Sequence, residues 1–112
     1  MMNIALLGST GSIGVNALNV IRRNPGLYRI QALGAGTNID LLLAQTEEFK
    51  PRTVVLRDAD LAVAFRDRLP SHLQPEVLHG TTGLLAVVRR GETDTVIRSE
   101  EHTSELQSRQ SI

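Results

Sequence analysis

The chain has 112 residues, of which 41% are apolar, and it carries no formal net charge at neutral pH. This size and apolar content predict one small folded domain and exclude a chain that is disordered throughout. The balanced charge gives no electrostatic reason to expect a nucleic acid or an anionic membrane as partner, and the absence of cysteine excludes disulfides and thiol nucleophiles.

The first residues, Met1–Ile4, lack the basic segment and the long apolar run of a secretory signal. No apolar stretch approaches the roughly 20 residues that span a bilayer. We therefore expect a cytoplasmic protein, or a plastid protein if the source is a plant and a transit peptide is missing.

Short apolar runs alternate along the chain with longer segments that have the period of a helix. The apolar runs predict five strands, at Asn3–Leu7, Tyr28–Ala35, Thr53–Leu56, Glu76–Leu78 and Asp94–Ile97. The segments between them predict helices that begin at Ser12, Asn38, Asp58 and either Thr81 or Thr82. Strict alternation is typical of the α/β class, and right-handed crossovers then give a doubly wound parallel sheet of the Rossmann-like type. We expect the central strand order 3-2-1-4-5.

Two of the predicted helices have recognisable ends and faces. The first runs from Ser12 to Asn24, where Asn-Pro-Gly stops it, and its expected buried residues are Ile13, Ala17, Val20 and Ile21. The second is capped by Asn38, ends before Pro51, and has the expected inward residues Ile39, Leu42, Leu43 and Thr46. Each helix starts just after a strand, where a doubly wound fold binds its ligands.

A glycine-rich loop lies between the first predicted strand and the first predicted helix. Its glycines stand in the context that a dinucleotide-binding loop requires, although the spacing is G-x-x-G-x-x-G rather than G-x-G-x-x-G. Gly8 can make the tight turn off the strand, Gly11 allows the backbone to approach a pyrophosphate, and Gly14 lets the helix pack closely on the sheet. No Lys-Ser/Thr pair follows, which disfavours a mononucleotide kinase or a GTPase.

The amino end of the first helix is the predicted phosphate site. The free amides of Ser12, Ile13 and Gly14 would face the phosphates, with the positive end of the helix dipole behind them. The hydroxyls of Thr10 and Ser12 can add hydrogen bonds. The alternative is a glycine-rich turn that binds nothing.

The end of the second predicted strand indicates which nicotinamide cofactor is preferred. Enzymes that prefer NAD usually place a carboxylate there for the ribose 2′-hydroxyl, whereas this chain reads LGAGTN at positions 33–38. The first carboxylate, Asp40, already lies inside the next helix. Thr37 and Asn38 could hydrogen-bond to a 2′-phosphate, so the sequence favours NADPH. Asn38 could instead be an N-cap only, and the two roles are compatible because a capped helix N-terminus is itself favourable to anions.

The remaining candidates carry weaker signals. His72 lies in a polar loop and is expected to be solvated, and His79 is expected to serve a turn, with a cofactor contact as the alternative. The arginine pairs at 22–23 and 89–90 end helices, where cations interact favourably with the dipole. No carboxylate cluster has metal-ligand spacing, so we assign no catalytic residue and no metal ligand to this chain.

The character of the sequence changes abruptly after Ile97. The segment Arg98–Ile112 has two apolar residues, Leu106 and Ile112, and no helical stripe. Its stretch RSEEHTSELQS resembles the translated sequence of a common sequencing-adapter oligonucleotide. We therefore expect a domain at 1–97 and a foreign, disordered tail at 98–112, with a natural polar tail as the alternative.

Two longer stretches resemble a known family. ALLGSTGSIGVNALNVIRRNP and YRIQALGAGTNIDLLLAQTEEFKPRTVVL resemble the N-terminus of the 1-deoxy-D-xylulose 5-phosphate reductoisomerases, and the likeness extends more loosely to Ile97. The specific combination is GSTGSIG, a helix that ends in Arg-x-Asn-Pro, and AGxN after the second strand. Homoserine and aspartate-semialdehyde dehydrogenases have related loops but not this combination.

The resemblance implies an NADPH-dependent enzyme of the non-mevalonate isoprenoid pathway. In that family Mg²⁺ or Mn²⁺ assists the rearrangement of 1-deoxy-D-xylulose 5-phosphate, and NADPH reduces the resulting aldehyde to 2-C-methyl-D-erythritol 4-phosphate. The resemblance implies pyrophosphate contacts from Thr10, Gly11, Ser12 and Ile13, and 2′-phosphate contacts from Gly36, Thr37 and Asn38. Some members carry a lysine or an arginine at the position of Thr37. Its absence here weakens the expected binding of the 2′-phosphate.

The family continues beyond Ile97 with the rest of the cofactor domain, a catalytic domain with acidic metal ligands, and a C-terminal helical domain. The resemblance therefore implies a truncated NADPH-binding domain, inactive by itself, from a homodimeric oxidoreductase. Two alternatives remain: a stand-alone NADP(H)-binding module, and a fragment of another NADP-dependent dehydrogenase. A stand-alone module would need the edge of its sheet to be covered after Ile97.

Overall fold

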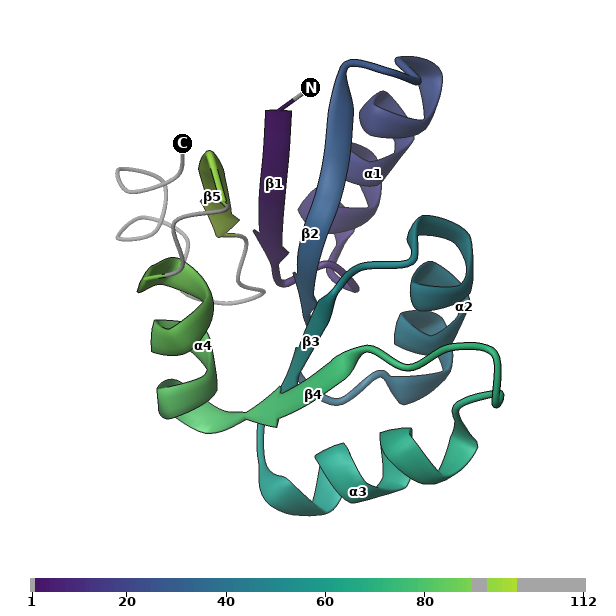
Figure 1. Ribbon diagram of the computed structural model, residues 1–112, viewed down its shortest axis with the longest axis vertical. Coiled ribbons are helices and arrows are strands. Elements are labelled where there is room, and N and C mark those ends of the chain that lie inside the picture. Colours follow the sequence, from purple (N-terminus) through teal and green to yellow (C-terminus); the bar gives the residue numbers. More distant parts are fainter. Residues whose placement is uncertain (1, 90–92, 99–112) are drawn as a thin grey trace.

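The computed structural model describes residues 2–89 and 93–98, the last of them by its backbone alone. Strands and helices alternate from the first element to the last, as the sequence predicts (Figure 1). In chain order the elements are β1 (Met2–Leu7), α1 (Ser12–Arg23), β2 (Tyr28–Gly34), α2 (Ile39–Phe49), β3 (Thr53–Leu56), α3 (Ala59–Arg68), β4 (Glu76–His79), α4 (Gly80–Arg89) and β5 (Thr95–Arg98). No helix within these ranges has the length and apolar content needed to cross a membrane.

The strands form one sheet in which every neighbouring pair is parallel, in the order β4-β3-β2-β1-β5. The expected order 3-2-1-4-5 is wrong, because β4 extends the sheet beside β3 and only β5 returns to lie beside β1. The period of a sequence marks a strand but not the strand with which it pairs, so the point where the winding reverses was not predictable.

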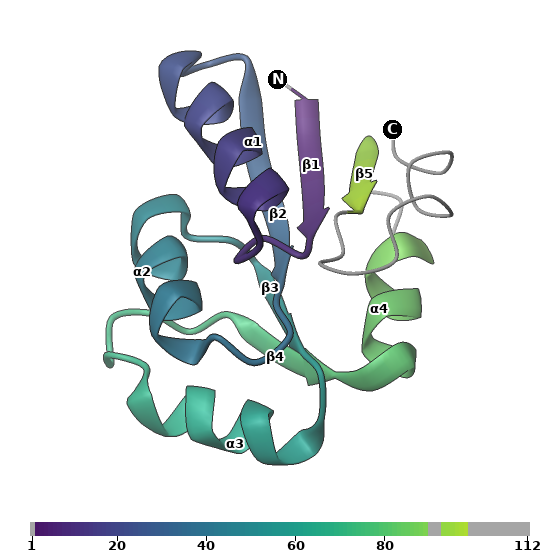
Figure 2. The same ribbon diagram turned by 180° about the vertical axis from the view of Figure 1, so that it is seen from behind.

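The doubly wound architecture itself is confirmed, because helices pack on both faces of the sheet (Figure 2). On one face the core contains side chains from α1, α2 and α3, including Leu18, Leu42 and Phe65. On the other face Val87 of α4 packs against a smaller core that includes Ala32 of β2. The central strands are therefore buried on both sides, which explains why they read as continuous apolar runs rather than as alternating patterns.

The buried face of α1 agrees only in part with the expected one, since Ile21 is buried and Ala17 packs against the core as expected. The helix buries Gly14, Leu18 and Ile21, whereas Ile13 is 61% exposed and Val20 is 51% exposed. The rotation of α1 about its axis follows from the close approach of Gly14 to the preceding loop, and apolarity alone did not reveal that contact. The expected faces of α2 agree better, since Leu42 and Thr46 are buried there.

The foreign tail that we expect at residues 98–112 lies outside the described residues, except for the backbone of Arg98, the last residue of β5. Leu106 and Ile112, the two apolar residues of the expected tail, also lie outside the described part of the chain. The tail therefore remains a sequence-based prediction.

Candidate functional site

The loop between β1 and α1 is a tight turn, as predicted. Gly8 has a φ angle of +83°, which an L side chain rarely adopts, and the amide of Gly11 donates to the Gly8 carbonyl oxygen at 3.2 Å. The amides of Gly8 and Ser9 both donate to the carbonyl oxygen of Gly34, at 2.7 and 2.8 Å. The loop is thereby fixed to the carboxyl end of the neighbouring strand β2.

Gly14 is the point at which α1 touches this loop. A Cβ atom built on Gly14 would lie 2.3 Å from the carbonyl oxygen of Gly8 and 2.7 Å from the Cα of Ser9. Both neighbours are backbone atoms, which cannot move aside without a change in the loop. The sequence predicted that Gly14 lets the helix pack closely on the sheet, but its close neighbours are the loop residues Gly8 and Ser9, so the first turn of α1 lies directly against the glycine loop.

The amino end of α1 is open to a ligand. Its N-cap residue, Gly11, has no side chain that could cap the helix, and the first turn contains no acidic residue. Ser12 and Ile13 are exposed beside it. Uncapped amides at the positive end of a helix dipole favour an anion such as a phosphate.

A buried pair, which the sequence analysis missed, holds this loop from behind. Ser9 is fully buried, and its Oγ donates to Oε1 of Gln45 at 2.7 Å. In return Nε2 of Gln45 donates to the carbonyl oxygen of Ser9 at 2.8 Å. Gln45 belongs to α2, so this pair links the glycine loop to the helix that follows β2. The sequence feature that could have indicated this pair is the position of Gln45, which lies beside the expected inward residue Thr46 on α2.

The second candidate loop, Gly36–Asn38, follows β2 and is exposed at the same edge of the sheet. The Oδ1 atom of Asn38 accepts a hydrogen bond from the amide of Leu41 at 3.1 Å, which confirms Asn38 as the N-cap of α2. A Cβ atom at Gly36 would meet nothing within 4 Å, so the space above this loop is free. Since Leu7 pairs with Gly34, the two candidate loops leave adjacent strands side by side.

Neither His72 nor His79 belongs to these loops. Nε2 of His72 is 2.9 Å from Oε2 of Glu47, and both side chains are exposed. His79 ends β4 and precedes Gly80, whose φ of +70° agrees with the expected turn. Residues 2–89 and 93–98 contain no group of three or more histidine, cysteine, aspartate or glutamate side chains that could hold a metal ion.

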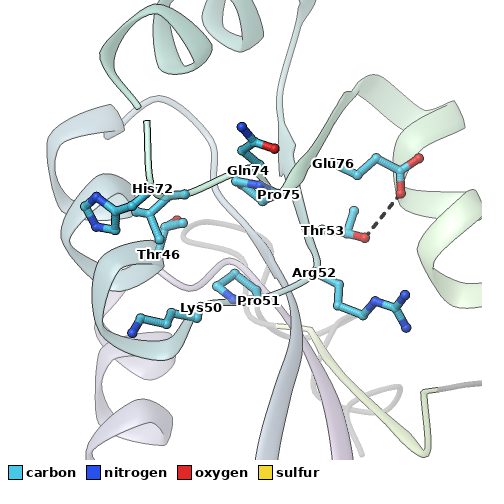
Figure 3. A pocket seen from close by; sticks show the side chains of 10 residues that line it. Thr46, Lys50, Pro51, Arg52, Thr53, His72, Gln74, Pro75 and Glu76 are labelled. Carbon is cyan, nitrogen blue, oxygen red and sulfur yellow. Dashed lines mark hydrogen bonds between the residues drawn. The ribbon is translucent and has the colours of Figure 1, made fainter. Parts of the chain in front are cut away.

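A cavity of about 500 Å³ lies at the opposite edge of the sheet, around the amino ends of β3 and β4 (Figure 3). Its lining includes Lys50, Arg52 and Glu76, and Oγ1 of Thr53 donates to Oε1 of Glu76 at 3.4 Å. None of the predicted site residues lines it. Doubly wound folds bind their ligands beyond the carboxyl ends of the strands, so the glycine loops are the better candidate site.

Comparison with known proteins shows that most of the chain is similar to one family. A family profile described as 1-deoxy-D-xylulose 5-phosphate reductoisomerase matches residues 4–109, a range that enters the segment where we expect the foreign tail. The enzyme of that name from Geobacter metallireducens is 43% identical over 97 residues, which are 87% of this chain and 25% of the relative. The Solibacter usitatus enzyme is 47% identical over 102 residues, or 26% of its length. The chain therefore spans about a quarter of the length of the curated relatives it matches.

Solved structures give the same comparison in three dimensions. A DOX-P reductoisomerase in complex with NADPH, fosmidomycin and magnesium superposes with a TM-score of 0.82 at 34% identity, covering 87% of this chain and 24% of that one. The Zymomonas mobilis reductoisomerase in complex with NADPH superposes with a TM-score of 0.77 at 27% identity, covering 86% of this chain and 25% of that one.

Proposed function

The chain belongs to the 1-deoxy-D-xylulose 5-phosphate reductoisomerase family, and from this premise we propose that residues 1–97 are the N-terminal part of its NADPH-binding domain. The observation that carries the proposal is the contact between Gly14 and the Gly8 carbonyl, which brings the uncapped end of α1 against the glycine loop. This arrangement presents several amides to one anion without an intervening side chain.

The first candidate loop would hold the pyrophosphate of the cofactor. We assign backbone contacts there to Thr10, Gly11, Ser12 and Ile13, with Gly8 and Gly14 shaping the turn. The support is the free amino end of α1 and the anchoring of the loop through Gly34 and the Ser9–Gln45 pair. An anchored loop loses little conformational freedom when a ligand binds, which favours affinity.

The second candidate loop, Gly36–Asn38, would surround the 2′-phosphate of NADPH. It offers exposed backbone and the side chains of Thr37 and Asn38, and it contains no carboxylate. The Asn38 oxygen caps α2, so its amide nitrogen is the group that would donate to the phosphate. The capping role and the binding role therefore use different atoms of one side chain.

NADPH, when bound, supplies the hydride for reduction of the rearranged sugar phosphate. In this proposal the described residues hold and orient the cofactor, and the Mg²⁺ or Mn²⁺ ligands and the groups that bind 1-deoxy-D-xylulose 5-phosphate lie in the remainder of the whole enzyme. The proposal extends to a whole enzyme that is homodimeric and cytoplasmic. It also includes the foreign origin of residues 98–112, which genomic sequence across Ile97 would test.

Titration with NADPH and NADH tests the cofactor assignment. The chain should bind NADPH more tightly than NADH. Asn38→Asp keeps a capping oxygen but adds a negative charge, so it should weaken NADPH binding about tenfold or more, because like charges in one contact cost several kcal/mol. Asn38→Ser is the matched control, a neutral residue that also caps, and should weaken NADPH binding less. Equal affinity of the unmodified chain for the two cofactors would refute the assignment.

A further inference from the structure

We propose that Arg57 is a specificity-determining residue that binds the 2′-phosphate of NADPH and supplies the positive charge that the loop Gly36–Asn38 lacks. The inference rests on the proposed function, because it concerns the same cofactor. The 2′-phosphate would then be bound by residues that follow two neighbouring strands, β2 and β3, and not only by the loop that follows β2.

The register of the sheet brings Arg57 beside the second candidate loop. Gly34 pairs with Val55, and the amide of Ala35 donates to the Val55 carbonyl oxygen at 3.0 Å. Gly36 follows Ala35 directly, and Arg57 directly follows the last residue of β3, so the two chain segments leave adjacent strands at the same end of the sheet. Adjacent strands are about 4.8 Å apart, a gap that the long side chain of arginine spans.

The guanidinium of Arg57 is available for a ligand. Its side chain is 68% exposed, and the ion pair found for it within residues 2–89 and 93–98 joins its Nε to Oδ2 of Asp58 at 4.0 Å, the outer limit for such a pair. Asp58 uses its other oxygen, Oδ1, to cap α3 by accepting from the amide of Leu61 at 3.0 Å. Arg57 is thus held weakly and remains exposed.

The charges around Arg57 are mixed, since Asp58 and Asp60 follow it in the chain while the loop beside it carries none. The loop Gly36–Asn38 is neutral, and the nearest following carboxylate, Asp40, forms an ion pair with Arg68 at the end of α3. That pair offsets the repulsion that Asp40 would exert on a phosphate. A guanidinium beside a neutral loop can then form the bidentate hydrogen bonds that suit a phosphate group.

The test compares NADPH and NADH binding in the unmodified chain, Arg57→Gln and Arg57→Lys. Loss of a charge-assisted contact should weaken NADPH binding by Arg57→Gln about tenfold, with NADH binding unchanged. Arg57→Lys should recover part of the loss. Added salt should weaken NADPH binding more steeply in the unmodified chain than in Arg57→Gln. The matched control is Arg29→Gln, an exposed arginine near the amino end of β2, which should leave both affinities unchanged.

The outcomes separate the two proposals. If the unmodified chain prefers NADPH and Arg57→Gln keeps that preference in full, the role of Arg57 is wrong while the cofactor assignment stands. If the unmodified chain shows no preference, the cofactor assignment fails first. If the chain binds neither cofactor, the same variants are measured in a chimera in which residues 4–97 replace the matching segment of the Geobacter metallireducens enzyme. There, an unchanged KM for NADPH in Arg57→Gln overturns the role of Arg57.

Discussion

At the scale of single residues, two glycines of the candidate site have opposite surroundings. Gly14→Ala would place a methyl group 2.3 Å from the Gly8 carbonyl oxygen, whereas the same methyl at Gly36 would meet nothing within 4 Å. We expect Gly14→Ala to lower the free energy of unfolding by about 2 kcal/mol or more, as overpacking does, and Gly36→Ala to change it by less than about 0.5 kcal/mol. Urea denaturation measures both, and equal stability of the two variants would contradict the close approach at Gly14.

Among single residues, the roles that depend on neighbours in the sequence were predictable, and those that depend on distant partners were not. The roles of Gly8 and Gly14 follow from spacing, because a tight turn and a close helix contact are local requirements. The partnership of Ser9 with Gln45 is not local, since 36 positions separate them. The burial of Gln45 could not be predicted from the sequence, because it depends on the partner with which the side chain forms hydrogen bonds. The proposed role of Arg57 could not be predicted either, because it depends on the pairing of β2 with β3, which periodicity does not reveal.

At the scale of elements, an ion pair joins the helices α1 and α2. Arg22 forms hydrogen bonds to both carboxylate oxygens of Glu48, one of them at 2.7 Å, and its guanidinium lies 5.4 Å from the centre of the Phe49 ring. The hydrogen bond from Arg22 lowers the pKa of Glu48. A lowered pKa in the folded state stabilises the protein above the ordinary pKa of glutamate, and the contribution is lost as the pH falls through the lowered value.

Glu48→Gln should therefore reduce the melting temperature at pH 7, by less than about 4 °C because both side chains are exposed. The difference from the unmodified chain should shrink as the pH falls below about 4.5, the ordinary pKa of this carboxyl, and also in concentrated salt. Asp67→Asn, on the exposed surface of α3, is the control. Thermal denaturation across this pH range is the measurement, and a difference that does not shrink as the pH falls would exclude the ion pair as its cause.

Elements were also the scale at which prediction succeeded most fully. In the described part of the chain, each strand lies close to its predicted range, because each strand is an apolar run with a polar boundary. Each helix begins close to its predicted start, because it follows a recognisable turn or cap. The strand order was wrong, and the buried face of α1 was right only for Ala17 and Ile21. Both depend on how elements pack against one another, which the period of the sequence does not reveal.

At the scale of the whole molecule, we expect no turnover from this chain. The part that the structure describes contains no group of side chains able to hold a metal ion, and the chain spans about a quarter of its relatives. Hydride transfer needs the cofactor and the substrate to be held in contact, and the rearrangement needs a bound divalent ion. An NADPH-oxidation assay with 1-deoxy-D-xylulose 5-phosphate and Mn²⁺, run beside the full-length Geobacter metallireducens enzyme, should show activity in the control alone. Metal-dependent turnover by the purified chain would contradict this expectation.

The return of the chain to β1 has a consequence for folding during synthesis. The amide of Asn3 donates to Oδ2 of Asp94, and the amide of Asp94 donates to the Asn3 carbonyl, each at 2.8 Å and across 91 positions. Contacts so distant in sequence form slowly, because a long loop must close before they contribute. On the ribosome β1 is made first and gains β2 early, yet its other edge stays open until Thr95–Arg98 has emerged. The open edge of β1 is thus exposed to pairing with another nascent chain for as long as β5 has not emerged.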